Sequence, residues 1–367
     1  MPHHPLCTFP WTKSPLIGNA PMSGIATSAL AAAVTLSGGL GLIGFLDDPR
    51  RLDRELRQAK SLLQGMDIQQ THDTQFDPES GTTSLPIGIG IIALAMNPST
   101  LLPLLAKYKP ALVWLSFGET HDFKAWTDNI RQTSPTTKIW IQLGRVRAAL
   151  DAAQSCEPDA LVLQGSDAGG HGHARGSSIV TLVPEVADTL SRAGMGDIPL
   201  IAAGGIMDGR GVAGALALGA SGVVMGTRFL GAVEADLPRG YREEILGAVD
   251  GGEATVRSRV FDEIWGGGNP WPRVYDGRCL RNMCFEDWEG GMDGREVRER
   301  LDQRIRDARD GEVAVRETSS LWAGAGVGMV REVEVAREIV VRVREEARER
   351  LQHVAGQFAA SKAEIED

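Results

Sequence analysis

A glycine-rich stretch that contains two histidines is the part of this chain whose residue types best suit chemistry. Residues 164–178 read QGSDAGGHGHARGSS and follow an apolar run, so His171 and His173 stand among small side chains. A histidine can hold or accept a proton near neutral pH, and glycine lets the backbone approach a flat ligand closely. The stretch therefore predicts a loop that lies against a ligand and carries a histidine able to move a proton.

Eight apolar runs, each ending in glycine or small residues, predict the elements that position this loop. Continuous apolar runs separated by helical patterns are typical of parallel strands buried on both faces. Eight such units in about 230 residues is the count of a closed (β/α)8 barrel, with an open doubly wound sheet as the alternative. The expected strands are 15–20, 40–45, 85–94, 111–118, 138–144, 160–165, 199–206 and 222–229.

The predicted fold class is therefore α/β, a TIM barrel over residues 14–234 with two additions. Residues 235–293 are irregular and include WGGGNPWPRVYDG, so we expect a loop-rich segment that covers the barrel as a lid and sets substrate preference. Residues 294–367 are rich in charge and form the predicted helical extension. In it, apolar residues recur at three- and four-residue steps and predict a helix packed on the barrel, with a dimer contact as the alternative. They are Val333, Ala336, Val340, Val343, Ala347, Leu351 and Val354.

Two predicted strand ends carry residues suited to binding a phosphate. The segment AAGGIMDGRG places Gly204 and Gly205 at one strand end and Asp208 as the N-cap of the next helix. The segment GVVMGT ends the next strand with Gly226 and Thr227, which offer backbone N–H groups and a hydroxyl. In TIM barrels the loops after strands seven and eight commonly hold a phosphate. The alternative is that these glycines only allow tight turns.

The composition narrows the classes of partner and compartment. A formal net charge of −10, without a basic patch, argues against nucleic acid and anionic membrane partners. The four cysteines are scattered and complete no zinc site, which favours free thiols in a reducing compartment. No apolar run approaches the roughly 20 residues that cross a bilayer, and no secretory signal is recognisable. We expect a cytoplasmic protein without a metal site.

Four motifs, in this order and spacing, resemble those of the nitronate monooxygenases, formerly called 2-nitropropane dioxygenases. They are APMSG, QGSDAGGHG, IPLIAAGGI and GVVMGTRF. The resemblance covers residues 14–234 well and continues more loosely into the C-terminal helix. It implies an enzyme that binds FMN and oxidises alkyl nitronates with dioxygen, giving a carbonyl compound and nitrite.

The resemblance also implies roles for individual residues. His171 takes the catalytic role, and two forms of that role stay open. A charged imidazole would steer the anionic nitronate, whereas a neutral one would abstract the α-proton of a neutral nitroalkane. The residues expected to hold FMN are Ala20, Pro21 and Met22 beside the ring, Gln142 and Gln164 at polar edges of the ring or ribityl chain, and Gly170, Gly204, Gly205, Gly226 and Thr227 at the phosphate end.

The chain departs from the family pattern late in the third strand. Relatives often carry asparagine where this chain reads Gly88-Ile89-Gly90, so one polar contact to the flavin is lost. We interpret His173 as a solvated loop histidine. Trp114 and Trp140 lie inside predicted strands and are expected in the core rather than against a flavin.

Two other functions remain open on the same scaffold. One is an FMN-dependent reductase of enoyl thioesters or quinones that uses NAD(P)H, because flavin-dependent enoyl reductases share the barrel and a similar glycine–histidine loop. The other is a flavin-binding module without activity, since a fold does not fix a function. Flavin reduction by an alkyl nitronate alone would favour the nitronate oxidase, and reduction only by a nicotinamide would favour the reductase.

Overall fold

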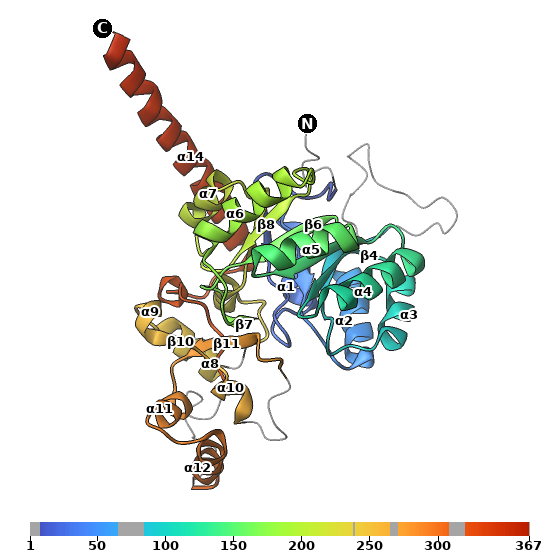
Figure 1. The fold of residues 1–367 in the computed structure, drawn as a ribbon, viewed down its shortest axis with the longest axis vertical. Coiled ribbons are helices and arrows are strands. Elements are labelled where there is room, and N and C mark those ends of the chain that lie inside the picture. The colour runs from blue at the N-terminus through green and yellow to red at the C-terminus, as the bar shows by residue number, and fades with distance from the viewer. Residues whose placement is uncertain (1–7, 65–83, 238, 265–270, 308–319, 367) are drawn as a thin grey trace.

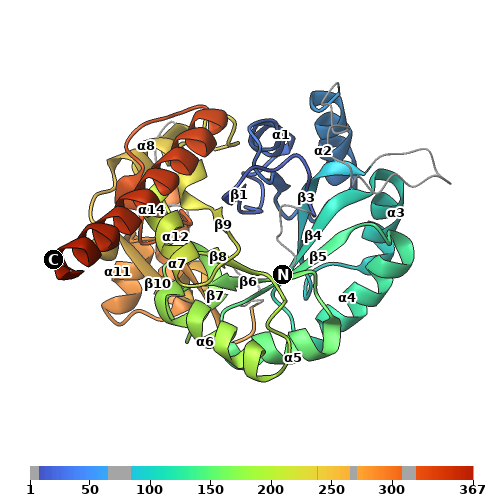
Figure 2. The same cartoon turned by 90° about the horizontal axis from the view of Figure 1, so that it is seen from above.

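Eight parallel strands form the barrel that the sequence predicts (Figures 1 and 2). The computed structural model describes residues 8–64, 84–237, 239–264, 271–307 and 320–366. The strands are hydrogen-bonded in the order β1-β9-β8-β6-β5-β4-β3-β2, and each coincides with a predicted apolar run. They are β1 (Leu16–Asn19), β2 (Leu42–Ile43), β3 (Leu85–Ile92), β4 (Pro110–Ser116), β5 (Lys138–Leu143), β6 (Ala160–Gln164), β8 (Leu200–Ala203) and β9 (Gly222–Met225).

Helices surround this barrel on its outer side (Figure 2). Every residue of β4 is buried, as expected for a strand between a filled interior and a helical shell. Asp208 caps the helix after β8, because its carboxylate accepts from the N–H groups of Arg210 and Gly211. The helices are α1 (Ser28–Leu36), α2 (Pro49–Leu62), α3 (Pro98–Tyr108), α4 (Thr120–Thr133), α5 (Val146–Cys156), α6 (Ile179–Arg192) and α7 (Gly209–Ala217).

Aromatic side chains fill the interior of the barrel. Trp114 and Trp140 are buried with ring centroids 6.2 Å apart, which confirms the prediction that they belong to the core. Phe9, which precedes the first strand, packs edge-on against Trp140 at 5.8 Å. The interior is thus a packed core, and a ligand must bind at the end of the barrel rather than inside it.

Asn19 joins β1 and β2, the strands at the two ends of the sheet order, and so completes the barrel. Gly18 forms an isolated parallel bridge with Leu40, just before β2. One residue on, the fully buried Asn19 carboxamide accepts from the N–H of Leu42 at 3.0 Å and donates to its carbonyl at 2.8 Å. A side chain here supplies the two hydrogen bonds that a neighbouring strand would otherwise provide.

Replacing Asn19 by leucine is expected to lower the free energy of unfolding by about 3 kcal/mol, because the buried N–H and C=O of Leu42 both lose their partner. Urea denaturation followed by circular dichroism measures this loss. Asn129→Leu on the outer helix α4 is the control, since in the described structure that carboxamide donates within its own helix, to the carbonyl of Ala125. An Asn19→Leu loss no larger than that of Asn129→Leu would contradict the role in closure.

The glycine–histidine stretch forms a strand of a second sheet. β7 (Gly170–His173) pairs antiparallel with β11 (Tyr275–Leu280), which pairs with β10 (Thr255–Ser258). His171 lies opposite Gly277 in this pairing. The GHGH sequence has no apolar alternation, so its strand character comes from a partner about a hundred residues away.

The part of the chain after the barrel forms most of a second hydrophobic core, to which Met207 and Leu230 of the barrel region also belong. This core includes Phe261, Cys279 and Phe285, and in Figure 1 the helices of this part lie together at one end of the molecule. Residues 265–270, most of the WGGGNPW stretch, lie outside the described residues. The helices are α8 (Arg239–Gly247), α9 (Gly251–Ala254), α10 (Val260–Glu263), α11 (Met283–Glu289) and α12 (Gly294–Asp307).

The C-terminal helix α14 (Ala336–Glu366) packs on the barrel only through its first half. Ala336, Val340, Val343 and Ala347 of the predicted stripe are fully buried, and this half contacts α1 and α7. The stripe is wrong at its ends: Val333 is 41%, Leu351 38% and Val354 36% exposed. Val333 precedes the helix, and the second half of α14 extends away from the barrel (Figure 1).

None of the helices in the described ranges is both long enough and apolar enough to cross a bilayer.

Candidate active site

The residues that the sequence singles out lie at the carboxyl ends of the barrel strands. Ala20 follows β1, Gln142 and Gln164 lie at the ends of β5 and β6, Gly204 follows β8 and Gly226 follows β9. In a TIM barrel this is the end that carries the active site, and we call it the barrel mouth. The structure therefore brings five separate stretches of sequence to one face of the barrel.

The Ala20-Pro21-Met22 turn is held against the strand ends by its backbone. The N–H of Ala20 donates to the carbonyl of Met225 at 2.8 Å, and that of Met22 donates to Ala20 at 2.8 Å. Pro21 lies very close to β3: a Cβ added to Gly90 would be 2.5 Å from the Cβ of Pro21. The position of Pro21 therefore leaves no room for a side chain at Gly90.

The two glycines after β8 adopt conformations that other residues rarely take. The φ angles are +103° at Gly204 and +74° at Gly205, in the region that favours glycine. A Cβ on Gly204 would lie 3.0 Å from the side chain of Ala168, so this turn packs against the start of the glycine-rich stretch. Thr227, after β9, accepts at Oγ1 from the N–H of Gly324 at 2.9 Å.

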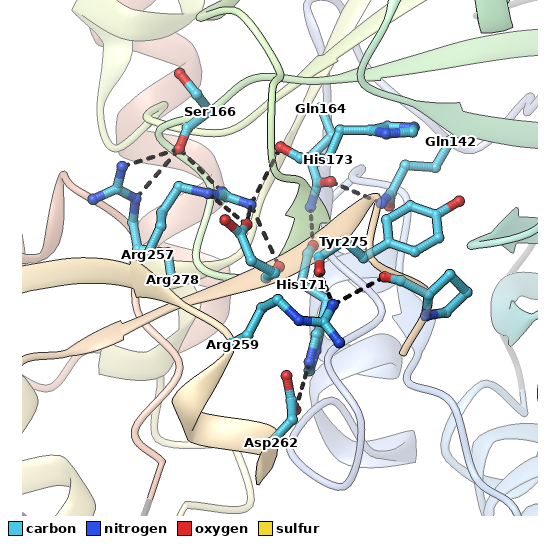
Figure 3. Close-up of polar contacts among 12 residues, drawn as sticks. Gln142, Gln164, Ser166, His171, His173, Arg257, Arg259, Asp262, Tyr275 and Arg278 are labelled. Atoms are coloured by element: carbon cyan, nitrogen blue, oxygen red, sulfur yellow. Dashed lines mark hydrogen bonds and ion pairs between the residues drawn. The ribbon is translucent and has the colours of Figure 1, made fainter. Parts of the chain in front are cut away.

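A relay of side-chain hydrogen bonds leads from the barrel interior to His171 (Figure 3). Trp114 Nε1 donates to Gln142 Oε1 at 3.0 Å, and Gln142 Nε2 donates to Gln164 Oε1 at 3.1 Å. Gln164 Nε2 then donates to the backbone carbonyl of His171 at 2.9 Å. The relay fixes the orientation of both carboxamides and attaches β7 to the barrel mouth.

The His171 ring lies between aromatic side chains. It stacks on Trp271 with centroids 3.9 Å apart and an angle of 18°, and Trp322 lies 4.6 Å away on a tilted plane. Phe117 approaches edge-on at 6.4 Å. On the polar side, His171 Nε2 lies 2.8 Å from Oδ1 of Asp262 in α10. Figure 3 draws this contact as a dashed line. The ring is therefore restrained on its faces and at one nitrogen.

His173 is not the solvated loop histidine that the sequence suggested. It is half-buried on β7, and its ring lies 5.0 Å from that of Tyr275. Burial, with the nearby positive charges of Arg145 and Arg257, lowers the pKa of His173 to about 4. A neutral His173 is therefore a packing residue of the second sheet near neutral pH.

Acidification is expected to destabilise the fold through His173. Between the unfolded pKa of 6.5 and the folded pKa of about 4, only the unfolded chain binds the proton, so stability falls as the pH drops through this range. His173→Gln cannot titrate and should lose less melting temperature than the wild type between about pH 7 and about pH 4.5. Scanning fluorimetry at the two pH values tests this, and equal losses would contradict it.

Two arginines of the second sheet converge on the same carbonyl (Figure 3). Arg257 and Arg278 are cross-strand neighbours on β10 and β11, and both donate to the carbonyl of Ser166. Arg257 also forms an ion pair with Asp276. Burial, followed by the charge of Arg257, lowers the pKa of Arg278. These cations add positive potential beside the glycine-rich stretch.

The sequence placed Asp262 and Trp271 in the expected lid segment, but it did not single out Asp262, Trp271 or Trp322 as neighbours of His171. Asp262 is 91 residues from His171 along the chain and reaches it only through the second sheet and α10. The sequence around Asp262, SRVFDEIW, lies in the region of the chain where the resemblance to the family motifs is loose. Within the described ranges, no group of three or more His, Cys, Asp or Glu side chains could hold a metal ion.

Comparison with known proteins assigns the family. A family model described as nitronate monooxygenase matches residues 7–346. The chain belongs to the nitronate monooxygenase family. Members of this family are flavin-dependent oxidoreductases.

Two named relatives agree with this assignment, and one solved structure shares the fold. The chain is 39% identical to the nitronate monooxygenase npaC of Metarhizium robertsii, over 93% of each chain. It is 38% identical to a nitronate monooxygenase of Neurospora crassa, over 96% of this chain and 94% of that one. The solved structure of FabK from Thermotoga maritima superposes with a TM-score of 0.71 at 25% identity, over 96% of this chain and 98% of that one.

Proposed function

We propose that this protein binds FMN and oxidises alkyl nitronates with dioxygen to a carbonyl compound and nitrite. The observation that carries the proposal is the placement of His171, on a glycine-rich strand over the barrel mouth in a member of the nitronate monooxygenase family. The restrained imidazole can serve either as a cation that steers the nitronate or as a base.

FMN fits the residues at the mouth. A Cβ on Gly226 would meet nothing closer than Ala20 Cβ at 3.4 Å, and one on Gly170 would meet nothing within 4 Å, so both glycines border open space. Ala20, Pro21 and Met22 would lie beside the ring, and Gln142 and Gln164 offer amides to its polar edges. The proposed phosphate end is Gly170, Gly204, Gly205, Gly226 and Thr227. When bound, FMN supplies the redox chemistry.

The residues around His171 would do three things for the reaction. Trp271, Trp322 and Phe117 form an apolar wall that excludes water and strengthens electrostatic interactions near the imidazole. Gln164 holds the backbone of His171 at the mouth. The half-buried Arg278 adds a positive field that favours an anionic substrate.

The test is the visible spectrum of the purified protein, followed without oxygen as an alkyl nitronate and then a reduced nicotinamide are added. Bleaching of a flavin spectrum by the nitronate alone is the expected result. Bleaching only by the nicotinamide would favour the reductase, for which the family match and the two named relatives give less support. Bleaching by neither would favour a flavin-binding module without activity, and no flavin after reconstitution with FMN would overturn the cofactor assignment.

The organisation beyond the barrel is part of the same proposal. Residues 14–234 would bind FMN, 235–293 would cover it and set substrate preference, and 294–367 would be a helical extension. Asp262 and Trp271, both in the second segment, contact His171 and so support its role over the mouth. The exposed apolar side chains of Leu351, Val354 and Phe358 on α14 support a homodimer. Buried free cysteines support a cytoplasmic location.

A further inference from the structure

We infer that Asp262 is a positioning residue that makes His171 a base: its carboxylate holds the hydrogen of the ring on Nε2 and leaves Nδ1 to receive the α-proton of a neutral nitroalkane. This inference rests on the proposed function. It decides between the two roles of His171 that the sequence left open.

The contact between the two side chains is close and sheltered. Oδ1 of Asp262 lies 2.8 Å from Nε2 of His171, and the side chains are 9% and 14% exposed. A carboxylate only accepts hydrogen bonds, so Nε2 is the donor in this pair. The stacked Trp271 limits rotation of the ring. In the described ranges Nδ1 forms no hydrogen bond, which leaves it for the substrate.

Within the described part of the chain, the side chain of Asp262 forms its hydrogen bond with His171. Its second oxygen, Oδ2, is buried and has no hydrogen-bond partner there. Buried carboxylates are normally paired or multiply hydrogen-bonded, because burial of a charge is costly. The cost of placing Asp262 here is therefore offset chiefly by His171.

The cations near Asp262 are engaged elsewhere. Arg259 donates to the carbonyls of Trp271, Pro272 and Tyr275, and lies 3.8 Å from Glu263. Arg257 pairs with Asp276. The negative charge of Asp262 is thus directed to the imidazole rather than shared with a guanidinium.

The step that needs this arrangement is proton abstraction. The bond between the α-carbon and its hydrogen breaks, the proton goes to Nδ1 of His171, and the electron pair forms the C=N bond of the nitronate while the nitro oxygens take the negative charge. The imidazolium that results is stabilised by the carboxylate of Asp262. A preformed nitronate has already lost this proton and does not need the step.

The test compares flavin reduction by nitroethane and by preformed ethyl nitronate in the FMN-loaded enzyme, without oxygen, in stopped flow. Asp262→Asn is expected to slow reduction by nitroethane about 100-fold and to change reduction by the nitronate less than about threefold. Asp262→Glu, which keeps the carboxylate, should recover most of the rate. Glu263→Gln is the matched control, because it removes a charge from the same helix without touching His171, and should leave both rates unchanged.

A second readout does not depend on activity. Nitrogen NMR of histidine-labelled protein reports which ring nitrogen carries hydrogen, and the His171 signal among the 7 histidines is identified by its absence from His171→Ala. We expect hydrogen on Nε2 in the wild type and a mixture of tautomers in Asp262→Asn. This readout remains decisive if Asp262→Asn binds FMN poorly.

Three results would overturn the inference: equal rate losses with both substrates, no loss with either, or a wild-type enzyme that nitroethane does not reduce. An unchanged tautomer in Asp262→Asn would overturn it as well. Failure of the proposed function looks different, since the wild-type flavin would then not be reduced by the preformed nitronate.

Discussion

Replacing His171 by alanine is expected to lower kcat/KM for the oxidation of a nitroalkane about 1,000-fold. The change removes the imidazole, which is the group that holds or moves the proton. The β7–β11 pairing involves the backbone of His171 and survives the change. The loss of the ring leaves the Asp262 carboxylate buried without its partner, which lowers stability. Steady-state oxygen consumption measures the activity, and flavin absorbance confirms that the cofactor is still bound.

Two further variants separate the chemistry of His171 from its packing. His171→Gln retains an N–H donor for Asp262 but cannot act as a base, so it should be more stable than the alanine variant and equally inactive with nitroethane. His173→Gln removes the neighbouring imidazole, which makes no hydrogen bond to Asp262 in the described structure, and should keep activity within about threefold of the wild type. Activity of His171→Ala within about tenfold of the wild type would remove His171 from the catalytic role.

The barrel was predictable from the sequence because each of its strands is buried along most of its length. A strand such as β4, buried at every residue, requires an uninterrupted apolar run, and this run is visible without any knowledge of its neighbours. The count of eight runs then favoured closure. The strand ends were equally readable, since turns such as Gly204–Gly205 need positive φ angles and therefore glycine.

The second sheet and the partner of His171 were not predictable in the same way. β7 is an edge strand of four residues with sequence GHGH, and it is a strand only because β11 pairs with it from far along the chain. Asp262 reaches His171 by that same long-range arrangement, and a single acidic residue in a helical stretch gives no local signal. The predicted C-terminal stripe was wrong at its ends for a related reason, because helical periodicity does not reveal where the barrel surface ends.

Replacing Gly226 by valine is expected to weaken FMN binding about 100-fold while leaving the fold intact. Gly226 has a φ of −100° and a ψ of −74°, so its backbone accepts a side chain without strain. Its Cβ would meet only Ala20 Cβ at 3.4 Å and Met22 Sδ at 3.9 Å, which are ordinary contacts. The methyl groups would instead extend into the open space that we assign to FMN, and overpacking there costs about 2–3 kcal/mol of binding free energy.

Fluorescence titration of the flavin-free protein with FMN measures the dissociation constant, and the melting temperature without FMN reports the fold. Gly214→Val is the matched control, because a Cβ on this exposed glycine of α7 meets nothing within 4 Å and the residue lies outside the barrel mouth. Weak FMN binding by Gly226→Val, with normal binding by Gly214→Val, would support the assignment of the glycine turn after β9 to the cofactor. Unchanged affinity in Gly226→Val would mean that FMN lies elsewhere on the barrel, since the added methyl groups cannot share the space beside Ala20 with a ligand.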